Sequence, residues 1–288
     1  MAGGALSCGY SAGALLALVR HCGLSFPHVI VASSGSAGAA TYKTAGQDNF
    51  IEYFWGHSLS KKQFISLRRF WKIMDIDYLV DEIFKKQAPL DVEKLKASPT
   101  KLFISVTNYK TGKPHFFSNQ DEVDIFEVLR ASKAAPLLYN KTVTINGVEY
   151  VDGALGAPIA VNIKKAFEEG ATDVIAIDNI IAYTLGTRAL LKLYSMFVSS
   201  NLADTIKNYS KSKERRESNQ NPRVLLLQPS IALPAGALQN NEESMCTTMA
   251  IGFADVVSNP QLNSFLKEKD NESWSFGTFL PPKDLGKD

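Results

Sequence analysis

Short apolar runs alternate with amphipathic stretches along this chain, and the alternation predicts buried strands connected by helices. Residues 28–32, 173–177 and 224–228 are apolar runs of the length expected for strands buried on both faces, as in a parallel sheet. Apolar positions at helical spacing predict helices over residues 10–22, 37–45, 49–59, 61–74, 75–86, 121–132, 159–169, 187–207 and 243–258. We therefore expect an α/β fold with a mostly parallel central sheet, right-handed crossovers and helices on both faces.

Two hairpins are expected within this alternation. Residues 102–109 and 114–117 read as strands on either side of a glycine turn, and residues 142–145 and 148–151 flank the turn dipeptide Asn146-Gly147. The outgoing strand of the second hairpin ends at Asp152-Gly153. A carboxylate at a strand end, followed by a glycine turn, is well placed to face a site.

A run of small residues follows the first buried strand. Residues 33–36 break the strand and a helix restarts behind them, which predicts a strand, a tight turn and a helix. In a nucleophile elbow the serine occupies such a turn, and the amide of the next residue points at the developing oxyanion. We place the nucleophile at Ser36 and that amide at Ala37, although the pattern Ser34-Gly35-Ser36-Ala37-Gly38 has one glycine out of place. The alternative is a plain turn between a core strand and a core helix.

The composition narrows the class of protein. The 288 residues contain no long linker, so one domain over residues 1–288 is expected. A net charge of +2 indicates no nucleic-acid partner, and three widely spaced cysteines favour neither a disulfide framework nor a metal site. No stretch reaches the roughly 18 apolar residues of a membrane span, and no signal peptide is apparent. We expect a cytoplasmic protein without a metal or other cofactor.

A basic stretch raises the possibility of contact with a membrane surface. Over residues 61–74, apolar and basic side chains separate onto different sides of the predicted helix. The residues expected to contact an anionic lipid surface are Lys61, Arg68, Arg69, Trp71 and Lys72. The alternative is an ordinary surface helix that packs its apolar stripe on the core.

Three motifs follow one another along the chain: the glycine loop of residues 2–9, the serine turn Ser36-Ala37-Gly38, and Asp152-Gly153-Ala154. In this order they resemble the motifs of the patatin-like phospholipases, in particular the bacterial members. The likeness extends over a core of about residues 1–180. Residues 181–288 are expected to complete the same domain, with a polar tail after about residue 259.

The resemblance implies a lipid acyl hydrolase, of phospholipase A or lysophospholipase type, with a Ser-Asp dyad. Ser36 would attack the ester carbonyl, and Asp152 would orient and deprotonate it. The oxyanion would be held by backbone amides of Gly3, Gly4, Ala5 and Ala37. The histidines agree with a dyad, because none of them lies in a strand-end loop after Asp152.

The chain also departs from the family pattern. Ser34 stands at the first glycine of the elbow, and Ser7 stands at the basic position of the glycine loop. The family enters this loop from a first strand that the sequence lacks, so we expect the natural chain to begin upstream of Met1. Two alternatives to hydrolysis stay open: a catalytically impaired lipid-binding or interaction module, and an acyltransferase that uses the same serine.

Overall fold

The strands β1 (Val29–Ser33) and β2 (Lys101–Asn108) run parallel and side by side. Strand β1 is the buried apolar run expected after residue 27, and β2 is the first strand of the first predicted hairpin. Three antiparallel strands extend this sheet: β3 (Pro114–Ser118) and β5 (Val148–Asp152) both pair with β2, and β4 (Val143–Ile145) pairs with β5. Both predicted hairpins are therefore confirmed. The sheet is mixed, because each hairpin returns its chain beside the preceding strand.

A second, two-stranded sheet consists of β6 (Val174–Ile177) and β7 (Val224–Leu227), which are parallel. The first residues of the chain lie between the two sheets. The amino group of Met1 donates to a carbonyl of β1 at 2.7 Å, and the amide of Ala2 donates to a carbonyl of β6 at 2.9 Å. The glycine loop is therefore held at the edge of β1, close to the point where that strand ends.

The computed structural model describes residues 1–69, 72–179, 192, 194–196, 198–212, 224–236, 238–239 and 241–267. Met1–Ser258 forms one compact unit, and the described part of the second unit is the helix α11 (Pro260–Lys267). The helical segments of the first unit are η1 (Ala5–Cys8), α1 (Gly9–Arg20), α2 (Gly35–Thr44), α3 (Asn49–Glu52), η2 (Tyr53–Ser58), η3 (Tyr78–Gln87), α4 (Val92–Lys96), α5 (Ile125–Ser132), α6 (Gly153–Gly156), α7 (Ile159–Glu168), α9 (Ser200–Ser212) and α10 (Glu242–Val257).

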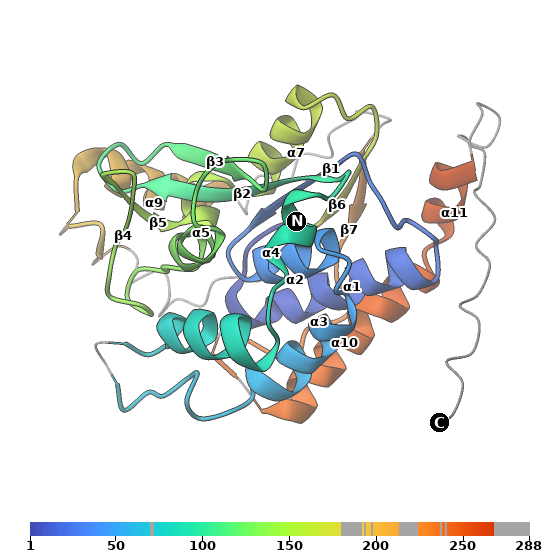
Figure 1. Ribbon diagram of the computed structural model, residues 1–288, viewed down its shortest axis with the longest axis horizontal. Coiled ribbons are helices and arrows are strands. Elements are labelled where there is room, and N and C mark those ends of the chain that lie inside the picture. The colour runs from blue at the N-terminus through green and yellow to red at the C-terminus, as the bar shows by residue number, and fades with distance from the viewer. Residues whose placement is uncertain are drawn as a thin grey trace. The chain divides into compact units, whose positions relative to one another are not determined.

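Helices cover both faces of the strands, as the sequence predicts, and this confirms the α/β class (Figure 1). Helix α7 packs on β1 and β6, while α2 packs on β1 and β2 from the other side. Helix α2 is itself covered by α1, on which α10 packs. The α1–α10 crossing is very close. A Cβ atom at Gly13 would lie 1.9 Å from the carbonyl oxygen of Met249, so the two backbones touch where glycine leaves room.

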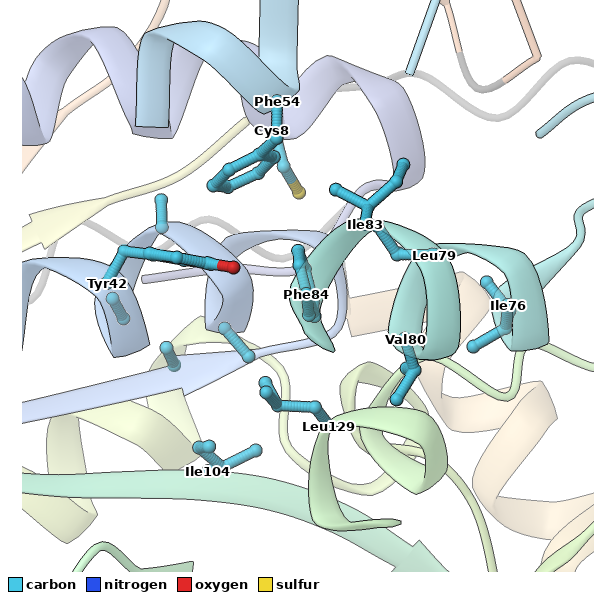
Figure 2. Close-up of a cluster of buried hydrophobic side chains, with 14 of the residues drawn as sticks. Cys8, Tyr42, Phe54, Ile76, Leu79, Val80, Ile83, Phe84, Ile104 and Leu129 are labelled. Carbon is cyan, nitrogen blue, oxygen red and sulfur yellow. The ribbon is translucent and has the colours of Figure 1, made fainter. Parts of the chain in front are cut away.

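The core beneath α2 is aromatic. The ring of Phe54 lies 5.1 Å from the ring of Tyr42 and 5.5 Å from that of Phe84, between centroids. Figure 2 shows these rings together with Ile83 and Leu129, which come from η3 and α5. Because these rings are buried and packed against one another, they hold α2 rigidly in place. The turn from β1 into α2 is held with it.

The helix predicted over residues 61–74 is wrong. The described part of this stretch consists of turns, and Ile65 and Met74 form an isolated antiparallel bridge. The guanidinium of Arg69 donates to the carboxylate of Asp75 and to two backbone carbonyls, and the ammonium of Lys72 lies 2.8 Å from the same carboxylate. The loop uses these cations to satisfy its own polar groups, which a periodic reading of the sequence cannot reveal.

Other predictions fall partly outside the described residues. Trp71 is one of these, and so is most of the helix predicted over residues 187–207, of which the described part belongs to α9. Among the residues that are described, no helix is both long and apolar enough to cross a bilayer.

Candidate active site

The turn between β1 and α2 is a single strained residue. Ser34 has φ 52° and ψ −125°, and the helix begins at the next residue, Gly35. A non-glycine residue in such a conformation costs on the order of 1 to 3 kcal/mol and clusters at functional sites. A strained serine between a strand and a helix is the geometry of a nucleophile elbow. Its hydroxyl donates to Oδ2 of Asp152 at 2.6 Å.

Ser36 lies elsewhere than the sequence suggests. It sits in the first turn of α2, is fully buried, and donates its hydroxyl to the carbonyl oxygen of Ala2 at 2.6 Å. The contact expected between Ser36 and Asp152 is therefore made by Ser34. The physical reason is the length of the turn: the helix starts directly after Ser34, so Ser36 points along the helix toward the glycine loop.

The sequence carries a signal for Ser34 that is no stronger than the one for Ser36. Read around Ser34, the elbow pattern has Ala32 and Ser36 in the places of its two glycines. Read around Ser36, it has one glycine of the two, at Gly38. Only the backbone conformation distinguishes the two readings, because the strained residue is the one at which the strand turns into the helix.

Asp152 is held at the junction of β5 and α6. Its Oδ1 accepts from the amide of Ala154 at 2.8 Å while Oδ2 accepts from Ser34. Burial raises the pKa of Asp152 to about 6, although the bonds from Ser34 and Ala154 and the charge of Lys133 act in the opposite direction. A Cβ atom at Gly153 would lie 1.9 Å from a carbonyl oxygen of β2, so the strand can pass into α6 here only with glycine.

The end of α5 connects the two side chains of the candidate dyad. The amide of Ser34 donates to the hydroxyl of Ser132, and the amide of Asp152 donates to the carbonyl of Ala134, each at 3.0 Å. One short segment thus fixes the backbone of both residues. The sequence alone gives no functional role to this segment, because serine and alanine are common in ordinary turns and helix ends.

The glycine loop lies against the candidate nucleophile. A Cβ atom at Gly3 would be 2.9 Å from the Cβ of Ser34 and 2.6 Å from that of Ala154. Within the described part of the chain, the amides of Gly3, Gly4 and Gly35 donate no hydrogen bond. Gly35 opens α2, whose N-terminus carries partial positive charge.

The remaining predicted oxyanion donors are less suitable. The amide of Ala37 already donates to the carbonyl of Ser34 at 3.1 Å, inside the first turn of α2. Since the strained residue lies two positions earlier than expected, the amide that follows it belongs to Gly35. Ala5, with φ 51°, begins η1 and turns the loop into that helix.

The described residues contain no group of three or more His, Cys, Asp or Glu side chains placed to hold a metal ion. Across the same residues, no histidine forms a hydrogen bond with Ser34 or Asp152. His28 instead pairs with the carbonyl of Glu169 at 3.1 Å, at the start of β1. The polar groups that the structure brings together at this site are the hydroxyl of Ser34, the carboxylate of Asp152 and nearby backbone amides.

The family model for patatin-like phospholipases matches residues 1–163, which include the glycine loop, the β1–α2 turn and Asp152. The chain belongs to the patatin-like phospholipase family. Membership in this family suggests lipid acyl hydrolase activity, and the three matched motifs are the ones that the fold brings together.

Known proteins extend the comparison. The chain is 29% identical to the uncharacterized protein YjjU of Escherichia coli (strain K12) over 129 residues, which are 42% of this chain and 34% of that protein. The match thus spans about a third of the length of that relative. The crystal structure of VipD from Legionella pneumophila superposes with a TM-score of 0.54 at 11% identity, covering 91% of this chain and 66% of that one, so the two share a fold.

Proposed function

We propose that this patatin-like protein is a lipid acyl hydrolase in which Ser34 is the nucleophile and Asp152 is the general base. The observation that carries the proposal is the 2.6 Å hydrogen bond from the hydroxyl of the strained Ser34 to Oδ2 of Asp152. A serine hydroxyl is a weak nucleophile until a neighbouring base takes its proton, and here the neighbour is a carboxylate.

The first half of the reaction forms an acyl-enzyme. Oγ of Ser34 attacks the ester carbonyl carbon while its proton passes to Oδ2 of Asp152. The C–O bond to the leaving alcohol then breaks, and Asp152 returns the proton to the alcohol oxygen. A base with a pKa of about 6 suits this exchange near neutral pH, because it is ionised at the start and acidic enough to give the proton back.

The second half hydrolyses the acyl-enzyme by the same route, with water in place of the serine hydroxyl. The tetrahedral intermediates carry an oxyanion. The donors we assign to it are the amides of Gly3, Gly4 and Gly35, which have no acceptor among the residues that the structure describes. The N-terminus of α2 adds its partial positive charge at the same place. Removing one such donor typically costs about 2.7 to 4 kcal/mol in the barrier.

Ser36 serves this site from behind the glycine loop. Its hydroxyl, together with Nδ2 of Asn179 at 3.0 Å, donates to the carbonyl of Ala2. The hydroxyl of Ser11 in turn donates to Oδ1 of Asn179 at 2.7 Å. This buried network fixes the peptide that precedes Gly3, so we assign Ser36 the role of positioning the oxyanion donors.

The substrate class is a lipid ester, of phospholipid or lysophospholipid type, reached from a membrane surface. The loop of residues 61–69 supports this contact, because Leu67 is 72% exposed at its tip beside the exposed Arg68. Arg69 and Lys72, by contrast, face the carboxylates of the loop itself. The surface contact we propose is thus a loop tip, with one apolar and one basic side chain.

Two experiments test these assignments. A fluorophosphonate probe should label Ser34, and Ser34→Ala should abolish both labelling and fatty-acid release from phospholipid; a Ser34→Ala variant with intact activity would refute the nucleophile. Leu67→Asp should reduce co-sedimentation with anionic vesicles. The control is Ile231→Asp, which changes an apolar side chain outside this loop that is 62% exposed, and it should leave co-sedimentation unchanged. Equal binding by all three proteins would refute the loop contact.

A further inference from the structure

Lys133 is a buried lysine for which the active site as described has no use. The residue is 6% exposed, and its ammonium group has no hydrogen-bond partner among the described residues. A lysine kept in this state loses its hydration without gaining a donor–acceptor bond, which is costly. Lysine is almost never fully buried unless it is paired, so the position calls for a physical reason.

The position of Lys133 points to the candidate dyad. It lies directly after α5, between the residue whose hydroxyl accepts from the amide of Ser34 and the residue whose carbonyl accepts from the amide of Asp152. Its amine lies 5.8 Å from the centroid of the Phe84 ring, in the core beneath α2. The segment that holds both reacting residues therefore also carries an unpaired amine into the interior beside them.

The charges around Lys133 can be assigned element by element. Asp152 from β5 and Cys8 from η1 both favour the charged form of the amine. The carboxylates of η3 and α5 and of the residue before η3 are engaged elsewhere. Asp77, Asp81 and Glu127 all bond to the guanidinium of Arg130, and Glu82 pairs with Lys86. Asp152 is therefore the carboxylate with which the charge of Lys133 interacts.

The geometry points to Lys133 as a positioning residue that acts through Asp152: its buried ammonium holds this carboxylate in the charged form that accepts the proton of Ser34. The inference rests on the proposed function, and it extends the dyad by a third, electrostatic member. Among the described residues its ammonium forms no hydrogen bond with the hydroxyl of Ser34, so the role we infer is indirect.

The order in which the two groups titrate supports this role. Burial lowers the pKa of Lys133 to about 7, while burial raises the pKa of Asp152 to about 6. The amine is therefore still protonated at the pH at which the carboxyl loses its proton. Without the amine, burial would act on Asp152 with less opposition, and the carboxyl would need a higher pH to ionise.

The same burial makes a prediction about stability. The unfolded chain binds a proton at Lys133 up to the ordinary lysine pKa of 10.5, whereas the folded protein releases it at about 7. Stability from this group is therefore lost as the pH falls from about 10 to about 7. Lys133→Met removes the charge that is costly to bury and keeps a side chain of similar length. The variant should therefore unfold at a higher urea concentration than wild type at neutral pH.

The kinetic test compares Lys133→Met and Lys133→Gln with wild type and with Lys164→Met, which removes a charge from a side chain that is 78% exposed on α7. With a water-soluble ester, the acid limb of kcat/KM should move up by about one pH unit in both Lys133 variants. This amounts to a roughly fivefold loss of kcat/KM near pH 6, which approaches about tenfold at lower pH, with little change near pH 8. An unchanged acid limb in a folded Lys133→Met protein would overturn the inference.

A second readout does not need activity. Carboxyl ¹³C NMR of aspartate-labelled protein, with the signal assigned through Asp152→Asn, should show Asp152 titrating at higher pH in Lys133→Met than in wild type or Lys164→Met. Identical titrations in the three proteins would overturn the inference. If wild type hydrolyses no ester and takes up no fluorophosphonate, the proposed function fails, and the NMR titration still decides whether Lys133 controls Asp152.

Discussion

The hydroxyl of Ser36 donates a 2.6 Å hydrogen bond to the carbonyl oxygen of Ala2, so the start of α2 is tied to the glycine loop. Two residues earlier, Ser34 bonds to Asp152. The two serines of the turn thus have separate partners: one faces the carboxylate, and the other holds the peptide that leads into Gly3. This division makes the roles of the two serines separable by experiment.

Ser36→Ala should lower kcat by about tenfold with little change in KM, because the loop that carries the oxyanion donors loses one of its restraints. Ser36→Cys, which keeps a weak donor, should recover part of the loss. Steady-state kinetics and fluorophosphonate labelling of both variants provide the measurement. If Ser36→Ala abolished labelling while Ser34→Ala retained it, the two assignments would have to be exchanged.

Asp152→Asn should inactivate the protein and stabilise it at neutral pH. The folded pKa of about 6 lies above the ordinary value of 3.8, so stability from this group is complete below about pH 3.8 and is lost as the pH rises through about 6. Asparagine carries no charge and avoids a cost on the order of 3 kcal/mol at pH 7. Urea unfolding should show this gain at pH 7 and a much smaller one at pH 4; an equal gain at both pH values would contradict the ionisation of a buried Asp152.

The acid limb of wild-type activity follows from the same group. Because the base must be ionised to accept the Ser34 proton, kcat/KM should rise with pH and level off above about 6. The measurement is a pH profile with a soluble ester substrate. An activity that continued down to pH 4 without loss would show that another group accepts the proton.

Gly3→Ala should reduce kcat by at least about a hundredfold, because the new methyl group would meet the Cβ atoms of both Ser34 and Ala154 and displace the loop. Overpacking of this kind should also destabilise the fold by about 1 to 3 kcal/mol. Gly236→Ala is the matched control, since a Cβ atom there would meet nothing within 4 Å. Full activity in Gly3→Ala would mean that the loop amides do not hold the oxyanion.

Arg130→Met should destabilise the protein by about 3 to 5 kcal/mol, because the largely buried guanidinium lies within 3.1 Å of the carboxylates of Asp77, Asp81 and Glu127. Burial acts to raise the pKa of Asp77, but hydrogen bonds from Tyr139, Lys141 and Lys72 lower it below its usual range. The pKa of Asp81 is lowered as well.

The stability that these carboxylates contribute is present above the ordinary carboxyl pKa and is lost at lower pH. The difference between wild type and Arg130→Met should therefore shrink on acidification. Chemical unfolding at pH 7 and pH 3 checks this, with Lys164→Met as a control for loss of an exposed charge. A difference that did not change with pH would assign the effect of Arg130 to packing alone.

The elements of this fold could largely be read from the sequence. The apolar strands, the Asn146-Gly147 hairpin and most helices follow from local periodicity and turn chemistry, and these act within a few residues. The order of the glycine loop, the serine turn and Asp152-Gly153 identified the family for the same reason. The loop of residues 61–74 could not be predicted in this way. It is held by hydrogen bonds from Arg69 to Asp75 and to two backbone carbonyls, and helical periodicity gives no sign of these bonds.

Which serine faces Asp152 was decided only by the tertiary structure. Ser34 and Ser36 have equal chemistry, and the motif around Ser36 is even the better match, with one glycine of two. The strain at Ser34 arises where β1 ends against the start of α2. The role inferred for Lys133 likewise depends on burial and on neighbours distant in sequence. Periodicity and motifs carry local information, whereas the partner of a hydroxyl or an ammonium is set by segments that meet only when the chain is folded.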